Sequence, residues 1–118
     1  MKKTFVQILK EVWEEKRKYF EDYRLYCQKI KEEAHKLLGT VEVLVFGSVV
    51  KGTFTPQSDI DVLVISENLP EDEEKRNEIK TFLKSRIDPF SPFQIHLATP
   101  EEFQQWYKRF IKQDFERI

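Results

Sequence analysis

The stretch GSVVKGTFTPQSDIDVLVIS, from Gly47 to Ser66, decides the fold of this chain. A largely apolar run, residues 41–46, precedes it, and a second one, residues 60–66, ends it. Two glycines, a proline and several hydroxyl side chains lie between the runs, a composition typical of an exposed loop. We therefore predict two buried strands over the two runs, joined by a loop at the surface.

Two carboxylates stand at the start of the second strand. Asp59 and Asp61 are two residues apart, so in an extended chain they lie on one face, about 7 Å apart. Carboxylates at this distance repel each other and lose solvation beside an apolar strand. Divalent cations remove both penalties, and oxygen ligands favour Mg²⁺ or Mn²⁺. The pair predicts a metal site of the kind that supports phosphoryl chemistry. The alternative is a loop-end cap with a salt bridge.

The other end of the stretch suits phosphate. Gly47 and Ser48 directly follow the first strand, and the residues up to Lys51 can form a short helical turn that Gly52 closes. A glycine at such a turn lets a phosphate approach the backbone, and the N–H groups at a helix start favour anions. The alternatives are a generic strand-to-helix turn and a solvated lysine. The pattern is not a P-loop, because Thr53 follows Gly52 where that motif needs lysine.

The chain has Gly47-Ser48, then Gly52, then Ser58-Asp59-Ile60-Asp61 followed by apolar residues. This pattern resembles the nucleotidyltransferase superfamily of DNA polymerase beta. The short length of the chain resembles the minimal members of that superfamily. The resemblance covers residues 41–97, with a weaker likeness in the tail. It implies transfer of a nucleoside monophosphate, AMP in the first place, from an NTP to a hydroxyl acceptor. It also implies that Asp59 and Asp61 are catalytic and bind Mg²⁺ or Mn²⁺. The implied nucleotide contacts are Gly47, Ser48, Lys51, Gly52 and Ser58. For Ser58 the alternative is a hydrogen bond that forms the turn.

The chain departs from this family at the third predicted strand, residues 93–97. Active relatives carry a third carboxylate there, and in this chain Gln94 stands at that place. An amide oxygen can still bind metal, but it supplies neither charge nor a base. Two hypotheses stay open: an active enzyme, and a nucleotide-binding or partner-binding module without catalysis. His96, on the same face, is either a metal ligand or base, or a strand histidine with a local hydrogen-bond partner.

The resemblance also implies a partner. Minimal members are often encoded beside a small helical HEPN protein as a toxin–antitoxin pair, in which the nucleotidyltransferase is the antitoxin. A tyrosine of such a partner is one acceptor that the resemblance implies.

The rest of the chain fits a single domain, residues 1–118. Residues 2–38 have a helical period, and one unbroken helix would be about 55 Å long. We expect that this helix breaks near residues 16–18, or that its aromatic stripe contacts another chain, which can be a second copy in a homo-oligomer. The alternative is that the stripe lies in the chain's own core. A charged helix is expected over 71–87. Thr99 predicts the start of a C-terminal helix over 99–118. The fold class is thus α/β (α+β): a small mixed sheet with helices packed on it.

The composition narrows the partners. Lys and Arg number 20 and Asp and Glu 21, for a net charge of −1, which argues against strong general binding of nucleic acid. The single cysteine, Cys27, fits a reducing compartment. The sequence has no run of about 18 apolar residues and no signal-peptide core. We expect a cytoplasmic protein without membrane association.

Overall fold

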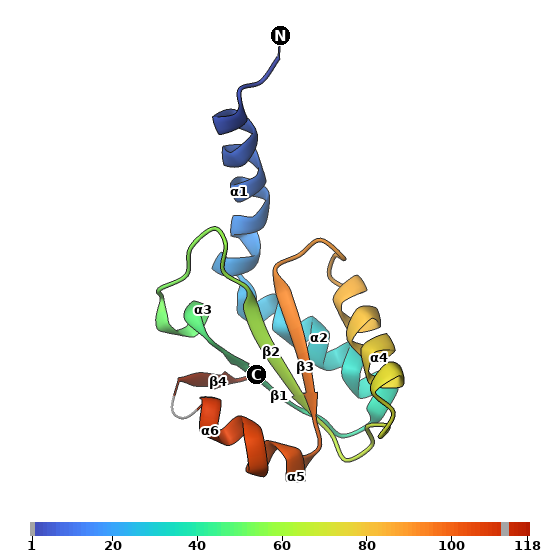
Figure 1. Cartoon of the computed structure of the whole chain (residues 1–118). Coiled ribbons are helices and arrows are strands. Elements are labelled where there is room, and N and C mark those ends of the chain that lie inside the picture. The colour runs from blue at the N-terminus through green and yellow to red at the C-terminus, as the bar shows by residue number, and fades with distance from the viewer. Residues whose placement is uncertain (1, 112–113) are drawn as a thin grey trace.

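A four-stranded sheet in the order β3-β2-β1-β4 forms the centre of the computed structural model, which describes residues 2–111 and 114–118. β2 pairs parallel with β3, and β1 pairs antiparallel with β2 and β4. The strands are β1 (Glu42–Phe46), β2 (Ile60–Ile65), β3 (Phe93–Ala98) and β4 (Phe115–Arg117). The helices beside the sheet are α2 (Tyr23–Leu38), α4 (Glu73–Ser85) and the C-terminal helical segment (Figure 1). The mixed α+β sheet with helices packed on it is confirmed.

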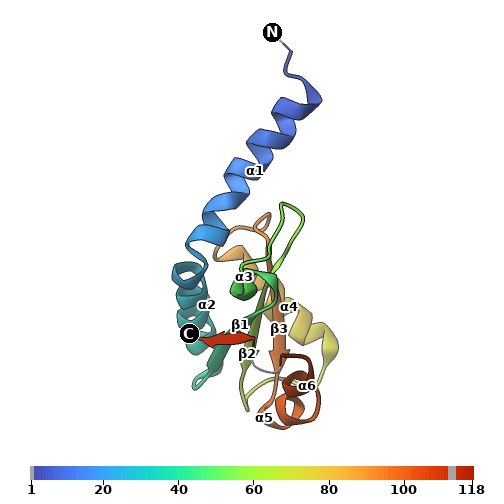
Figure 2. The same cartoon turned by 90° about the vertical axis from the view of Figure 1, so that its left-hand side faces the viewer.

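Each face of the sheet buries one set of alternating side chains. Val43, Val62 and Ile95 belong to the larger core, which includes α2 and α4. Leu44 and Leu63 belong to a smaller core on the other face, under the C-terminal helical segment. Figure 2 shows the sheet between α2 on one side and α5 (Pro100–Glu102) and α6 (Lys108–Ile111) on the other. Because the smaller core is short, the half of this face where β2 begins carries polar side chains.

The N-terminal helical region breaks, but later than predicted. α1 (Phe5–Glu21) ends at Asp22 and α2 starts at Tyr23, so the predicted break at residues 16–18 is wrong in position. Tyr19, Phe20 and Tyr23 flank the break and are buried. A bend at this point turns the aromatic side chains of both helices toward the sheet. These three residues are therefore in the chain's own core, while α1 extends away from the domain (Figures 1 and 2).

The C-terminal region starts as predicted and ends differently. Thr99 and Glu102 form a capping box: Thr99 Oγ1 accepts from the Glu102 N–H at 3.2 Å, and Glu102 Oε1 accepts from the Thr99 N–H at 2.9 Å. The helical segment is α5 (Pro100–Glu102), a π-helical turn η1 (Phe103–Tyr107) and α6 (Lys108–Ile111). A helix over 99–118 is wrong at its end, because β4 occupies the open edge of β1 there. Residues 112 and 113 of the predicted helix lie outside the described residues.

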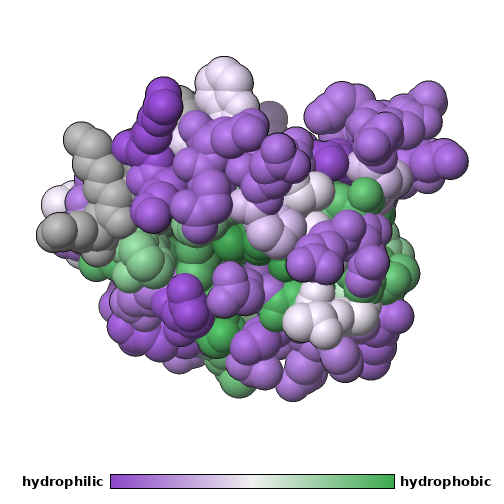
Figure 3. All heavy atoms as spheres, turned by 90° about the horizontal axis from the view of Figure 1, so that it is seen from below, coloured by the Kyte–Doolittle hydropathy of each residue, from purple (hydrophilic) through white to green (hydrophobic). Residues whose placement is uncertain are grey.

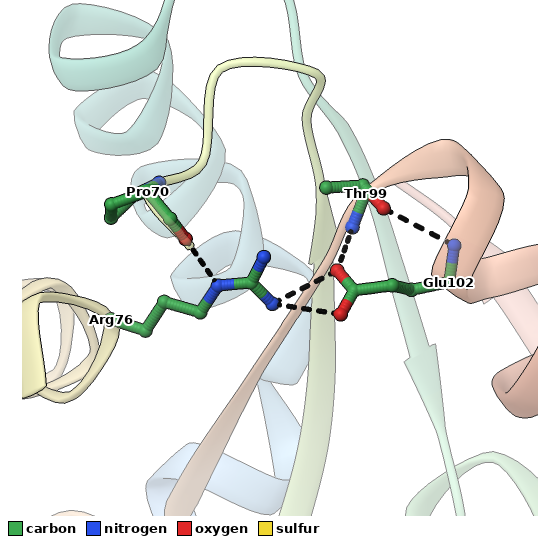
Figure 4. A network of polar contacts seen from close by, with 4 residues as sticks. All are labelled: Pro70, Arg76, Thr99 and Glu102. Atoms are coloured by element: carbon green, nitrogen blue, oxygen red, sulfur yellow. Dashed lines mark hydrogen bonds and ion pairs between the residues drawn. The ribbon is translucent and has the colours of Figure 1, made fainter. Parts of the chain in front are cut away.

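Arg76 joins α4 to the C-terminal segment. Its Nε donates to the Pro70 carbonyl at 2.6 Å, and its Nη1 donates to both oxygens of Glu102 at 2.9 and 3.0 Å (Figure 4). Glu102 is at the same time the partner of Thr99 in the capping box. Burial alone would raise the pKa of Glu102, but hydrogen bonds from Thr99 and Arg76 hold it below its ordinary value. One charge pair therefore sets the position of the segment that covers the smaller core.

Seen from below, hydrophobic patches show between hydrophilic side chains (Figure 3). A pocket of about 370 Å³ has a mixed lining that includes Val41, Ile65 and Pro100 beside Glu42, Ser66 and Asn68. No helix among the described residues has the length and apolar composition needed to cross a membrane.

Candidate functional site

The Gly47 turn joins β1 to a short helix, α3 (Ser48–Lys51). Gly47 has φ 88° and ψ −158°, and its carbonyl accepts from the N–H groups of Val50 and Lys51 at 3.2 and 3.4 Å. The first N–H groups of a helix, here those of Ser48 and Val49, have no earlier carbonyl of the helix to bond, and such groups can bind an anion. Gly52 closes α3 in the left-handed conformation, with φ 73°. The predicted helical turn between the two glycines is confirmed.

The turn lies directly against one of the two predicted carboxylates. Phe46, the residue before Gly47, pairs in the sheet register with Asp61. A Cβ atom on Gly47 would come within 2.7 Å of Asp61 Oδ2, closer than side chains pack. A larger residue at position 47 would therefore have to displace this carboxylate. The Gly47 turn and Asp61 lie side by side.

His96 holds the other oxygen of Asp61. Its Nε2 donates to Asp61 Oδ1 at 3.1 Å, and since a carboxylate only accepts, Nε2 carries the hydrogen. Both side chains are about one quarter exposed. The imidazole lies between the rings of Phe46 and Tyr107, with centroids 5.4 and 6.1 Å away. Burial raises the pKa of Tyr107, so its phenol stays protonated beside the histidine. The local partner expected as an alternative for His96 is thus an aspartate of the site.

Gln94 and Asp59 lie near the start of β2, at the edge of the sheet. Gln94 is the register partner of Asp61 on the parallel strand β3, the place where a third acid was expected. Asp59 precedes β2 by one residue and is exposed. Both line a pocket of about 360 Å³, and Asp61 is not part of its lining. Gln94 is therefore the residue that this pocket shares with the surroundings of Asp61.

Two lysines of this pocket escaped sequence analysis. Lys80 and Lys84 of α4 are half-buried and line it together with Asp59 and Gln94. The sequence predicted only a charged helix over residues 71–87 and gave these lysines no role. The two lysines are four residues apart, and each directly follows an apolar residue of the helix, Ile79 or Leu83. This spacing is the signal that places them next to the sheet.

The donor set fits a hard cation, with positions left for substrate. Asp59, Asp61 and Gln94 offer carboxylate and amide oxygens, the ligands that Mg²⁺ and Mn²⁺ prefer. Among residues 2–111 and 114–118 no group of three or more His, Cys, Asp or Glu side chains could enclose a metal. A metal held here would take its remaining ligands from water or from a phosphate.

Two other predicted nucleotide contacts have local partners. Ser58 Oγ accepts from the Thr55 N–H at 2.8 Å, the turn-forming role given as the alternative. Lys51, at the far end of α3, lies 3.7 Å from a carboxylate oxygen of Asp114. Gly52 is at that same end. Contacts of these three residues with nucleotide stay predictions.

A family model and several solved structures match this chain. Residues 27–117 match the model of the nucleotidyltransferase domain. A crystal structure of a provisionally assigned nucleotidyltransferase is 33% identical with a TM-score of 0.61, over 77% of this chain and 95% of that one. A second such structure, from Sulfolobus solfataricus, is 21% identical with a TM-score of 0.53, over 92% and 84% of the two chains. A toxin–antitoxin structure with AMP-PNP is 21% identical with a TM-score of 0.55, over 76% and 69%. No curated protein matches the sequence.

Proposed function

Since the chain belongs to the nucleotidyltransferase domain family, we propose that it transfers a nucleoside monophosphate, AMP in the first place, from an NTP to a hydroxyl group. The observation that carries the proposal is the close approach of Asp61 to the Gly47 turn. A Cβ atom added to Gly47 would lie 2.7 Å from Asp61 Oδ2. A metal-bound triphosphate needs an anion-binding turn and a carboxylate side by side, and this contact supplies both.

Each part of the site has a role in the proposal. The backbone of Gly47 and Ser48 binds the β- and γ-phosphates. Asp59 and Asp61, with the amide oxygen of Gln94, hold Mg²⁺ or Mn²⁺. The bound metal supplies charge stabilisation for the triphosphate. His96 fixes the orientation of Asp61 through its hydrogen bond.

In the proposed reaction the acceptor's hydroxyl oxygen forms a bond to the α-phosphorus. The bond from that phosphorus to the bridging oxygen breaks, pyrophosphate leaves, and the hydroxyl proton passes to a carboxylate oxygen of the aspartate pair, Asp59 and Asp61. Positioning and electrostatic stabilisation provide most of the rate in chemistry of this kind. Lys80 and Lys84, beside Asp59, would attract the charged groups of substrate or acceptor.

The acceptor and the setting belong to the same proposal. A tyrosine of a HEPN-type partner is the acceptor we propose, with this chain as the antitoxin. A structural neighbour that is a toxin–antitoxin assembly supports the idea of a partner protein. The cytoplasm provides the NTP, the magnesium and the reducing conditions that suit the single Cys27.

A non-catalytic nucleotide-binding or partner-binding module is the second candidate. The observation that favours it is Gln94, which stands beside Asp61 without a charge. Such a module would bind NTP and metal and leave them unreacted.

Transfer from α-labelled ATP with Mg²⁺ or Mn²⁺ tests the proposal, with and without a HEPN-type protein encoded nearby. We expect metal-dependent label on the acceptor that the double variant Asp59→Asn, Asp61→Asn abolishes. Asp22→Asn, at the junction of α1 and α2 where the side chain makes no capping bond, is the matched control and should keep full transfer. Binding of ATP without any label on protein or nucleic acid supports the module and contradicts the enzyme.

A further inference from the structure

The first three turns of α1 carry an uncovered apolar face. Phe5, Val6, Ile8, Leu9 and Val12, here called the α1 face, are exposed by 75, 72, 46, 51 and 56%. The molecule is 54 Å long but only 28 and 23 Å across, because α1 extends past the domain (Figure 1). Apolar surface gathered on one projecting helix marks a contact with another molecule.

The α1 face continues a stripe that is core further along the helix. Phe5, Leu9, Val12, Lys16 and Tyr19 follow each other at steps of four and three residues, the spacing of one helix side. Tyr19 is 7% exposed against the domain. Lys16 marks the boundary, since its Nζ donates to the Pro56 carbonyl at 2.9 Å. The covered half of the stripe therefore ends where the domain ends, and the other half lacks a neighbour among the described residues.

A groove opens at this boundary. It measures about 460 Å³ and lies between α1 and the loop before β3. Val12, Tyr19 and Phe90 provide apolar walls, and Phe90 is 93% exposed. Three carboxylates (Glu11, Glu15 and Asp88) and one cation, Lys16, border the groove. Glu11 pairs with Lys3 of the same chain. The lining is still acidic in balance, so the groove suits an apolar side chain that arrives with positive charge.

The start of α1 has these properties. Phe5 is its most exposed large apolar residue, and Lys2 and Lys3 precede it. Lys3 already pairs with Glu11 of its own chain at 2.9 Å, so the two charges match in reach and sign. A second α1 running antiparallel would bring Phe5 and its lysines to the groove, and its Val12 to the first chain's Phe5.

Only the antiparallel direction fits the shape. The domain packs against the same stripe at Tyr19 and Phe20, so a second α1 that lies parallel on the α1 face would collide with this domain. A second α1 that lies antiparallel leads its own chain away from this domain. A parallel pair would also place the basic start over the basic start and the acidic residues 11–15 over each other, whereas the antiparallel pair joins opposite charges.

We propose that two copies of this chain form an antiparallel dimer through α1, in which the groove of each copy receives Phe5 of the other. A stable dimer needs about 800 Å² from each partner. Under twofold symmetry each chain contributes both its α1 face and its groove to the interface. The match to the family begins at residue 27, within α2, so this interface uses a segment outside the matched domain. It does not depend on the proposed catalysis.

Light scattering coupled to size-exclusion chromatography tests the dimer over a concentration series. We expect twice the mass of one chain. Phe5→Glu should give monomer with unchanged circular dichroism, because an acid in the first turn of a helix is favourable. Phe90→Ala should raise the dimer dissociation constant. Leu25→Glu, at an equally exposed leucine of α2 (68%) outside the α1 face, is the matched control and should stay dimeric.

Disulfide trapping tests the direction. Phe5→Cys chains mixed with Val12→Cys chains should form a mixed disulfide on oxidation, while the buried Cys27 does not react. A monomer at all concentrations, or a dimer that Phe5→Glu leaves intact, overturns the proposal. A disulfide that forms only between two Phe5→Cys chains also overturns it, since it indicates a parallel pair.

Discussion

At the scale of single residues, the site depends on the absence of a side chain at Gly47. Its positive φ of 88° is strained for any other residue, and its missing Cβ leaves room for Asp61 Oδ2. Gly52 has a similar φ of 73° but nothing within 4 Å of a Cβ. Both glycines therefore have a positive φ, but their ψ values of −158° and 18° differ, and only Gly47 has a carboxylate where a Cβ would lie.

Gly47→Ala should destabilise the fold more than Gly52→Ala, and it alone should impair function. Gly52 is in the left-handed region, where a side chain costs about 1–2 kcal/mol. The combination of φ 88° and ψ −158° at Gly47 is open almost only to glycine. Urea unfolding measures both losses. Only Gly47→Ala displaces the Asp61 carboxylate, and a shift of about 1 Å in a catalytic group costs on the order of 100-fold in rate. We expect this loss in the nucleotidyl transfer assay, or in ATP affinity if turnover is absent. Equal losses in the two variants would show that the contact with Asp61 has no functional role.

Gln94→Glu should restore the third carboxylate. Gln94 is the register partner of Asp61, so a charge here adds to the same cation site. We expect Mn²⁺ to bind about tenfold more tightly, which is about 1.4 kcal/mol, and transfer to rise. Without metal, repulsion from Asp61 should lower the unfolding midpoint, and Mn²⁺ should recover it. Gln94→Ala is the control for size and for the lost amide. Isothermal titration with Mn²⁺ that gives one affinity for wild type and Gln94→Glu would place Gln94 outside the metal site.

At the scale of elements, the predictable parts have dense local signals. The loop from Gly47 to Asp61 carries glycines, a proline and paired acids between apolar runs, and Thr99 with Glu102 forms a complete helix start. The third strand alternates apolar and polar residues, which places Gln94 correctly beside Asp61. Each of these features needs only a few neighbouring residues to be recognised.

The elements that sequence analysis missed depend on contacts between distant segments. The helical period continues through Asp22, so the break becomes visible only once Tyr19 and Tyr23 must both reach the sheet. β4 has three residues and exists because β1 has an open edge. The hydrogen bond between His96 and Asp61 joins residues 35 positions apart and follows from the register of β2 and β3. Local patterns contain no information about such pairings.

The Arg76–Glu102 pair should stabilise the C-terminal segment more than a surface ion pair does. The Arg76 side chain is 11% exposed and that of Glu102 40%. Arg76→Ala should lower the free energy of unfolding by about 2 kcal/mol, because it leaves a half-buried carboxylate without its cation. Glu102→Gln should cost less, since an amide can still serve the capping box of Thr99.

Arg17→Ala is the matched control for this pair. Arg17 contacts Glu21 at 2.6 Å, but both side chains are more than half exposed, so the loss should stay below about 0.5 kcal/mol. Urea unfolding at neutral pH measures all three variants. A loss for Arg76→Ala no larger than for Arg17→Ala would show that the network in Figure 4 does not hold the segment.

At the scale of the whole molecule, Glu116 joins the last strand to the helical layer. It accepts hydrogen bonds from Arg24 at 2.7 and 2.8 Å and from the Tyr23 hydroxyl at 2.5 Å. The hydrogen bond from Arg24, followed by that from Tyr23, holds the pKa of Glu116 below its ordinary value. Burial, followed by the bond to Glu116, raises the pKa of Tyr23 to about 12. Burial, followed by the nearby Asp88, also raises the pKa of Tyr19 to about 12. Acid and alkali should therefore both destabilise the fold.

In acid, the unfolded chain takes up protons first, because its glutamates have an ordinary pKa of about 4.3. The stabilisation from Glu116 and Glu102 is present above that pH and is lost as the pH falls through their lowered pKa values. In alkali, unfolded tyrosines ionise near pH 10, so the contribution of Tyr19 and Tyr23 is complete below that pH and is lost as the pH rises to about 12.

Unfolding free energies between pH 3 and 7, and between about pH 9 and 12, should show both slopes. Arg24→Gln should flatten the acid slope, because it removes the main cause of the Glu116 shift. Tyr23→Phe should flatten the alkaline one. If both variants follow the wild-type curves in parallel, the pairing of β4 with α2 does not control the pH dependence, and other groups must carry it.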